Sequence, residues 1–267
     1  MSSERIQKLL AAAGIGSRRE VDRWLAEGLI SVNGLKVKPG DRASANDKIQ
    51  LRGKLLHLKA FSEVTPRVIA YHKPAGEIVA HHDPEKRPEV FERLPRLKSS
   101  RWVAVGRLDL NTSGLLLLTN DGALANKLMH PSSEVEREYA VRILGEVRKE
   151  HLLQLMQGVE LEDGMASFDS VAEAGGEGAN RWFHVVLREG RNREVRRLWE
   201  AMGFQVSRLV RLRYGPVALG RGLRRGKWRD LEPEEFKALY DAAGMEAPVP
   251  AQKRKSAQRQ KRHRGRR

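Results

Sequence analysis

The spacing of apolar residues over the first sixty positions changes from that of helices to that of strands. Apolar side chains recur at intervals of three and four over residues 6–13, which predicts an amphipathic helix that ends at Gly14. Ser17 and Glu20 have the spacing of a capping box and begin a second predicted helix over 18–28. Apolar and polar residues alternate on both sides of Asn33-Gly34, which predicts a β-hairpin with a type I′ turn, and "DKIQLRG" predicts one more strand. We expect a small module of two helices and a sheet.

Beyond residue 67 the pattern is richer in strands than in helices. Alternating or continuous apolar runs predict strands over 67–74, 115–118, 136–143, 181–190 and 206–219. Helical spacing predicts helices over 89–94, 123–130, 149–157 and 192–202. The strands lack the regular alternation with helices that a parallel sheet requires, so we predict an α+β fold with a mixed, mainly antiparallel sheet.

Four consecutive leucines, Leu115–Leu118, form the most apolar segment of the chain. Turn-forming residues bound the run on both sides, which indicates a short strand buried on both of its faces. Arg107 and Asp109 lie a few residues before it. A loop carboxylate is most often a surface group, so Asp109 taken alone predicts no chemistry.

Net charge separates this chain from an ordinary globular protein. The formal net charge is +16, a field that favours a polyanionic partner, usually RNA or DNA. Nine Lys and Arg residues and no acidic residue fall within 251–267, and the rest of the chain still carries +7. We expect this tail to be disordered in isolation and to contact RNA. The predicted organisation is an RNA-binding module over 1–60, a linker over 61–66, a second domain over 67–244 and the basic tail over 245–267.

Composition also excludes several classes of chemistry. The chain has no cysteine, which excludes disulfides, thiolate zinc sites and cysteine nucleophiles. Its eight histidines show no metal-ligand spacing, and no P-loop motif occurs. We therefore predict no metal site. No apolar run reaches eighteen residues, and from this we expect a cytoplasmic protein without a membrane segment.

Four motifs together resemble those of a known family. "GRLDLNTSGLLLLTNDG", residues 106–122, resembles the signature of the pseudouridine synthases, in the branch that modifies ribosomal RNA and carries an N-terminal S4 domain. "YHKPAGEIV", "REYAVRI" and "REGRNREVRRLWEAMG" resemble three further motifs of that family, in the same order. The module over 1–60 is similar to an S4 RNA-binding domain. The resemblance implies an S4-like domain followed by a pseudouridine synthase domain that needs no cofactor.

The resemblance also implies catalytic roles. Pseudouridine formation detaches uracil from its ribose, rotates it and rejoins it through carbon, and the family assigns the nucleophile to Asp109. Tyr139 is implied to stack on the target uracil and to assist removal of the C5 proton, although its pattern alone indicates core packing. Arg107 is implied to fill the space that the flipped-out nucleotide leaves.

Arginines supply the remaining implied contacts. Arg196 is the implied cationic neighbour of Asp109, and it lies roughly 60° from the buried Trp199 on a helical wheel, at the boundary of the apolar face. Arg193 and Arg197 fall on the outer side of that wheel and are expected to contact phosphates. Arg18, Arg19 and Arg23 follow one helix of the S4-like module and are further candidates for RNA binding.

The expected substrate is 23S ribosomal RNA of the large subunit, in a precursor particle, and the expected protein is a monomer. Two alternatives stay open. One is a synthase of the same branch that acts on small-subunit RNA or on another site, because RNA specificity comes largely from shape and loop contacts. The other is a non-enzymatic RNA-binding factor for ribosome assembly, in which the second domain is a scaffold.

Overall fold

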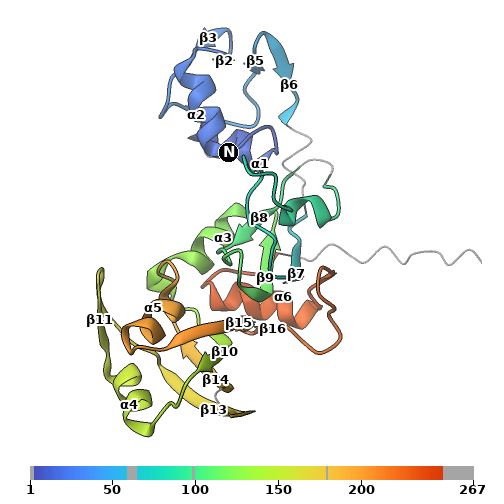
Figure 1. Ribbon diagram of the computed structural model, residues 1–267. Helices are drawn as coiled ribbons and strands as arrows, with labels where there is room; N and C mark the ends of the chain where they lie inside the picture. The colour runs from blue at the N-terminus through green and yellow to red at the C-terminus, as the bar shows by residue number, and fades with distance from the viewer. Residues whose placement is uncertain (1–2, 59–64, 98–99, 179, 249–267) are drawn as a thin grey trace, which may run out of the picture.

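The computed structural model describes residues 3–58, 65–97, 100–178 and 180–248. A small N-terminal domain lies at one end of the molecule, and a larger domain built on a long sheet forms the rest (Figure 1). Most of the predicted linker and most of the basic tail fall outside the described residues. No helix among the described residues is long and apolar enough to cross a membrane.

The N-terminal domain contains the two helices and the sheet that the sequence predicts. Its helices are α1 (Ile6–Ala12) and α2 (Arg18–Ala26). Its strands are β1 (Glu4–Arg5), β2 (Ile30–Val32), β3 (Leu35–Lys36), β4 (Arg42–Ala43), β5 (Ile49–Leu51) and β6 (Lys54–Leu56). The capping box is confirmed, since the Ser17 hydroxyl accepts from the Glu20 amide at 3.1 Å and the Glu20 carboxylate accepts from the Ser17 amide at 3.2 Å.

The hairpin and the core of this domain also agree with the sequence pattern. Asn33 and Gly34 both have positive φ, 52° and 87°, as a type I′ turn requires. β2 and β3 pair antiparallel across them, and the sheet has the order β3-β2-β5-β6. Ile6, Leu10, Val21, Leu25 and Ile30 belong to one buried cluster that takes all its residues from this domain.

The larger domain has more strands than the sequence pattern indicates. Its strands are β7 (Val68–Lys73), β8 (Val103–Val105), β9 (Ser113–Thr119), β10 (Arg137–Leu144), β11 (Val159–Leu161), β12 (Gly164–Ala166), β13 (Ser170–Glu177), β14 (Asn180–Leu187), β15 (Gln205–Tyr214), β16 (Val217–Ala218) and β17 (Trp228–Asp230). Its helices are α3 (Gly122–Met129), α4 (Lys149–Gln157), α5 (Glu194–Ala201) and α6 (Pro233–Ala242), with short 3₁₀ turns η2 (Val90–Arg93) and η3 (Pro131–Ser133).

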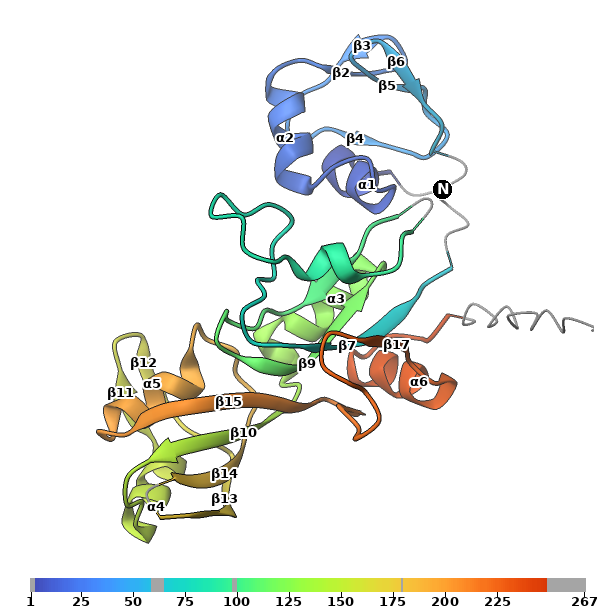
Figure 2. The ribbon, with the colours of Figure 1, turned by 45° about the vertical axis from the view of Figure 1, so that its right-hand side comes forward.

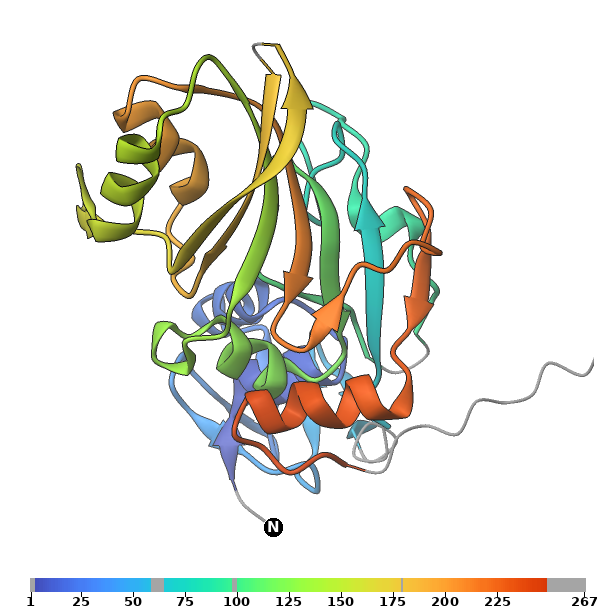
Figure 3. The same cartoon turned by 90° about the horizontal axis from the view of Figure 1, so that it is seen from below.

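Nine of these strands form one sheet in the order β13-β14-β10-β15-β9-β7-β17, with β16 beside β15 and β8 beside β9. Figure 3 shows the strands lying side by side across the domain. Every pairing in this sheet is antiparallel except that of β15 with β9. The prediction of an α+β fold with a mixed, mainly antiparallel sheet is confirmed.

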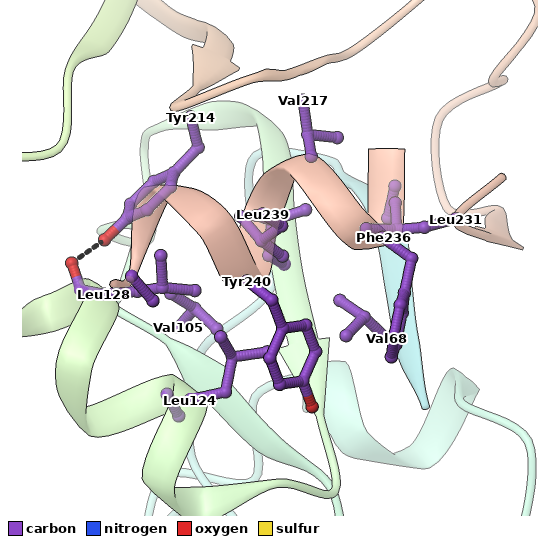
Figure 4. Close-up of a cluster of buried hydrophobic side chains, with 14 of the residues drawn as sticks. Val68, Val105, Leu124, Leu128, Tyr214, Val217, Leu231, Phe236, Leu239 and Tyr240 are labelled. Atoms are coloured by element: carbon purple, nitrogen blue, oxygen red, sulfur yellow. Dashed lines mark hydrogen bonds between the residues drawn. The ribbon is translucent and has the colours of Figure 1, made fainter. Parts of the chain in front are cut away.

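The leucine run lies in β9 and is buried on both faces, as predicted. All four leucines are fully inaccessible to solvent. Leu115 and Leu117 face a cluster that includes α3 and α6, whereas Leu116 and Leu118 face a second cluster that includes the turn η2. Figure 4 shows the first cluster, where Tyr214 also donates a hydrogen bond to the carbonyl of Leu128 at 2.8 Å.

Some expectations were wrong. The single strand predicted over 206–219 is two strands, because the chain turns at Gly215-Pro216 and β16 pairs back on β15 with Val217 opposite Tyr214. The apolar alternation continues across the turn, so the pattern could not reveal it. Helix α6 and the hairpin strand β13 had not been predicted. α6 supplies Phe236, Leu239 and Tyr240 to the cluster in Figure 4.

The two domains meet between the turn after α1 and the segment before β8. A β-carbon added to Gly14 would lie 3.1 Å from the carbonyl carbon of Ser100. Arg101 is half-buried next to Ser100, and burial lowers its pKa, while the charge of Glu20 in α2 acts in the opposite direction. The domains are therefore in direct contact through the turn after α1 and the segment before β8.

Candidate active site

A cleft of about 930 Å³ opens on one face of the large sheet. Its walls come from the segment before β9, the ends of β10, β14 and β15, and the turn that leads into α5. Figure 2 shows β9, β15 and β10 in succession, with α5 beside them. Arg107, Asp109, Tyr139 and Arg193 all line this cleft. The structure thus brings together four of the residues that the sequence singled out.

Asp109 stands in a turn whose backbone is fixed from several sides. Leu108 precedes it and is buried in the second cluster of β9, the one that includes the turn η2, so the turn is anchored to the core. The amide of Thr112 donates to the Asp109 carbonyl at 3.0 Å, which closes the turn. The amide of Gly76 donates to the Leu110 carbonyl at 2.8 Å. The Asp109 side chain itself is 35% exposed and faces the cleft.

Lys73 connects the end of β7 to this turn. It is fully buried, and its Nζ donates to the carbonyls of Pro74, Asp109 and Thr112 at 3.0, 3.0 and 2.8 Å. Burial lowers the pKa of Lys73 to about 8, while the charges of Glu77 and Asp109 act in the opposite direction. A buried lysine with three carbonyl partners holds the Asp109 backbone in one place and adds positive charge beneath it.

Arg196 reaches the same turn from α5. It is 7% exposed, and its two Nη atoms donate to the carbonyls of Val206, at 3.0 Å, and Asn111, at 3.1 Å. Burial, followed by the charge of Arg193, lowers the pKa of Arg196, whereas Asp109 raises it. Arg196 therefore acts on Asp109 through the turn and through its field, and the two side chains form no ion pair among the described residues.

The closest cation to the Asp109 carboxylate is Arg193, contrary to the helical-wheel expectation that it points outward. Its Nη1 lies 4.0 Å from Asp109 Oδ2. Arg193 precedes α5 with a left-handed backbone, φ 50° and ψ 26°, so the rotation of 100° per residue does not extend to it. The local backbone therefore turns Arg193 toward the cleft.

Tyr139 lies on the cleft floor in β10. It is half-buried and packs against two of the core clusters, on the same strand face as Val141 and Ile143, as its spacing predicts. Its hydroxyl makes no hydrogen bond within the part of the chain that the structure describes. An aromatic face and an unengaged hydroxyl are thus both available at the cleft.

Of the other predicted arginines, one is partly buried and four are exposed. Arg107 is exposed at the edge of the cleft. Arg197 is bound to Asp163 through both Nη atoms at 2.8 and 2.9 Å. Arg18, Arg19 and Arg23 are exposed along α2 in the N-terminal domain.

Sequence reasoning missed three buried charged residues of the cleft, namely Arg137, Arg211 and Glu194. Arg137 and Arg211 approach the Tyr214 ring, with their Cζ atoms 5.0 and 5.2 Å from its centroid. Alternation along β10 places Arg137 on the same face as Tyr139, and the pairing of β10 with β15 places Arg211 opposite Tyr139. The sequence pattern does not show that this face borders a cleft. Among the described residues no group of three His, Asp or Glu side chains could hold a metal ion.

Comparison with known proteins assigns the class. Residues 67–201 match the RNA pseudouridylate synthase family, and residues 4–49 match the S4 domain. The chain belongs to the RNA pseudouridylate synthase family and is an isomerase with an N-terminal S4 domain.

Its relatives share most of its length. It is 58% identical over 231 residues to ribosomal large subunit pseudouridine synthase B of Yersinia pestis, covering 86% of this chain and 73% of that one. The synthase B of Escherichia coli strain K12 is 56% identical over 86% of this chain and 80% of its own length. That of Pasteurella multocida is 53% identical over 93% and 73%. A crystal structure of a pseudouridylate synthase has the same fold, with a TM-score of 0.61, 24% identity, and coverage of 88% of this chain and 99% of that chain.

Proposed function

We propose that this protein converts a uridine of 23S ribosomal RNA to pseudouridine, with Asp109 as the nucleophile. The observation that carries the proposal is the placement of Asp109, whose backbone is fixed by Lys73 and Arg196 while its carboxylate faces a cleft large enough for a nucleotide. The assignment to large-subunit RNA rests on the relatives named synthase B at 53–58% identity.

The cleft supplies what the reaction needs from the protein. A target base must leave its stack to enter the cleft, and the exposed Arg107 at the edge is placed to occupy the vacated position. Tyr139 lines the cleft, and we assign its ring to stacking on the base and its hydroxyl to removal of the C5 proton. The guanidinium of Arg193 lies 4.0 Å from the Asp109 carboxylate that we assign as the nucleophile.

RNA is bound over a wider surface than the cleft. We assign phosphate contacts to Arg18, Arg19 and Arg23 of the S4 domain, which are exposed on one helix. Arg193 is assigned to the cleft because of its distance to Asp109. Arg197 would contact a phosphate only by sharing or exchanging its partner Asp163. We propose a monomer that acts on a precursor particle in the cytoplasm, where ribosomal RNA is its substrate.

The proposed domain limits are 1–60 for the S4 domain, 61–66 for the linker, 67–244 for the catalytic domain and 245–267 for the tail. The buried clusters support the first division, since one is confined to residues 6–58 and the others to residues beyond 67.

The test is a map of pseudouridines in ribosomal RNA from cells with and without the gene. Loss of one 23S pseudouridine, restored by the wild-type gene and not by Asp109→Asn, is expected. Loss of a 16S site would assign the protein to the small subunit. An unchanged map in cells whose ribosome assembly is impaired would favour a non-enzymatic assembly factor.

A further inference from the structure

Arg211 occupies the floor of the cleft between the two predicted catalytic residues. Its backbone in β15 pairs with Tyr139 of β10 on one side and with Gly114 of β9 on the other. Gly114 follows the Asp109 turn, so Arg211 lies between that turn and Tyr139. The side chain is 2% exposed and lines the cleft.

The guanidinium of Arg211 has an unused donor. Nε donates to the Leu115 carbonyl at 2.7 Å, and Nη2 is buried without a hydrogen-bond partner among the described residues. A buried charged donor with no acceptor is costly to leave unsatisfied. Because Arg211 lines the cleft, a ligand bound there could supply the acceptor.

Gly114 keeps the space beside Arg211 open. A β-carbon at this position would lie 2.3 Å from the Arg211 carbonyl oxygen, and φ is +109°, so only glycine fits. The close approach fixes the Arg211 backbone against β9, and no side chain from Gly114 stands between Arg211 and the Asp109 turn. The sheet thus holds the Arg211 backbone in a fixed place on the floor of the cleft.

In the second buried arginine of the floor, both Nη atoms have hydrogen-bond partners. Arg137 Nη1 donates to the carbonyls of Arg188 and Glu189, and its Nη2 donates to the Tyr214 hydroxyl at 3.2 Å. Arg137 therefore holds the cleft wall together, whereas Arg211 has an Nη atom without a partner among the described residues.

We propose that Arg211 is a further catalytic residue, which donates a hydrogen bond to a carbonyl oxygen of the target uracil. This inference rests on the proposed function of the cleft. When the N1–C1′ bond breaks, its electron pair stays on the uracil, whose carbonyl oxygens share the negative charge. The base then turns, the C5–C1′ bond forms, the C5 proton leaves and N1 takes up a proton. A fixed cation at the carbonyl stabilises the anionic stage more than the neutral uridine.

Single-turnover isomerisation of a 23S fragment by saturating enzyme tests this contact. Arg211→Met should lower the rate constant by about a hundredfold, the effect of removing one preorganised donor, and leave the RNA Kd within about threefold. Arg211→Lys should restore part of the rate because it keeps the charge. Arg208→Met is the matched control, since Arg208 is exposed on the same strand and does not line the cleft.

The RNA can be varied instead of the protein, which removes any dependence on the folding of a variant. Sulfur in place of O2 or O4 of the target uridine weakens the acceptor, and one of these two fragments should react at least about tenfold more slowly with the wild type. Equal rates for both thio fragments and the normal fragment would overturn the proposal. The proposal would also be overturned if Arg211→Met folds and reacts at the wild-type rate. It would equally be overturned if the variant only binds RNA more weakly, as expected for the loss of a phosphate contact. The proposed function itself fails only if the wild-type protein does not isomerise the normal fragment, or if Asp109→Asn does.

Discussion

Glu194 is a buried carboxyl in the cleft wall, and replacing it with glutamine should change how stability depends on pH. It is 3% exposed, its Oε2 accepts from the Arg191 amide at 3.0 Å, and its Oε1 is buried without a partner among the described residues. Burial raises the pKa of Glu194 to about 7, against the opposing hydrogen bond from Arg191 and with a further increase from the charge of Glu189.

The size of this change in stability follows from the difference between the proton affinities of Glu194 in the folded and unfolded states. The carboxyl has an ordinary pKa of 4.5, so between the two values the folded protein holds a proton that the unfolded chain releases. The stability that this proton supplies is fully present below pH 4.5 and is lost as the pH rises through about 7. A tenfold change in proton affinity is worth about 1.4 kcal/mol, so the total is about 3 kcal/mol, and about 2.5 kcal/mol of it falls between about pH 5 and pH 8.

Urea unfolding of the wild type and of Glu194→Gln at several pH values measures the contribution of Glu194 to the free energy of unfolding. Taking the difference between the two proteins cancels the titration of the groups that they share. The stability of the wild type relative to the variant should fall by about 2.5 kcal/mol from about pH 5 to pH 8. Glu200→Gln, at an exposed position of the same helix, should give a curve parallel to the wild type. Parallel curves for Glu194→Gln as well would refute the argument that this carboxyl is buried and protonated near neutral pH.

Three further changes have defined outcomes. Tyr139→Phe should retain RNA affinity and melting temperature while pseudouridine formation falls, and a wild-type rate would limit the tyrosine to packing. Gly114→Ala should lower stability by several kcal/mol, at least about 2, because the methyl group collides with the Arg211 backbone at a positive φ, and a normal thermal melt would show that β9 and β15 can separate. Deleting 251–267 should leave the melting temperature nearly unchanged and flatten the salt dependence of RNA binding, whereas superimposable salt slopes would show that the tail does not touch the RNA.

The strand pattern alone predicted much of the fold, because burial on both faces leaves a continuous apolar run. Leu115–Leu118 required a central strand, and β9 occupies that place. The turn between β15 and β16 was hidden because Val217 continues the alternation of the strand before it. Periodicity records which face a residue occupies and does not record where the chain reverses.

The residues of the site could be predicted only where they belong to a motif that resembles those of the family. Asp109 and Tyr139 were found through resemblance, and the structure places both on one cleft. The hydrogen bonds that fix the Asp109 turn come from Lys73, 36 residues away, and Arg196, 85 residues from its acceptor Asn111, and such side-chain-to-carbonyl bonds leave no local pattern. Arg193 was misplaced because a single left-handed residue ends the helical geometry on which the expectation was based.

The most direct test of the account is turnover by Asp109→Asn. The amide has nearly the same shape as the carboxylate but is no nucleophile, and the hydrogen bonds to the turn use only backbone carbonyls. Tritium release from a 23S fragment that carries 5-tritiated uridine measures isomerisation. We expect a loss of at least about a thousandfold in rate, with RNA affinity and melting temperature close to those of the wild type. Turnover within about tenfold of the wild type would remove Asp109 from the mechanism.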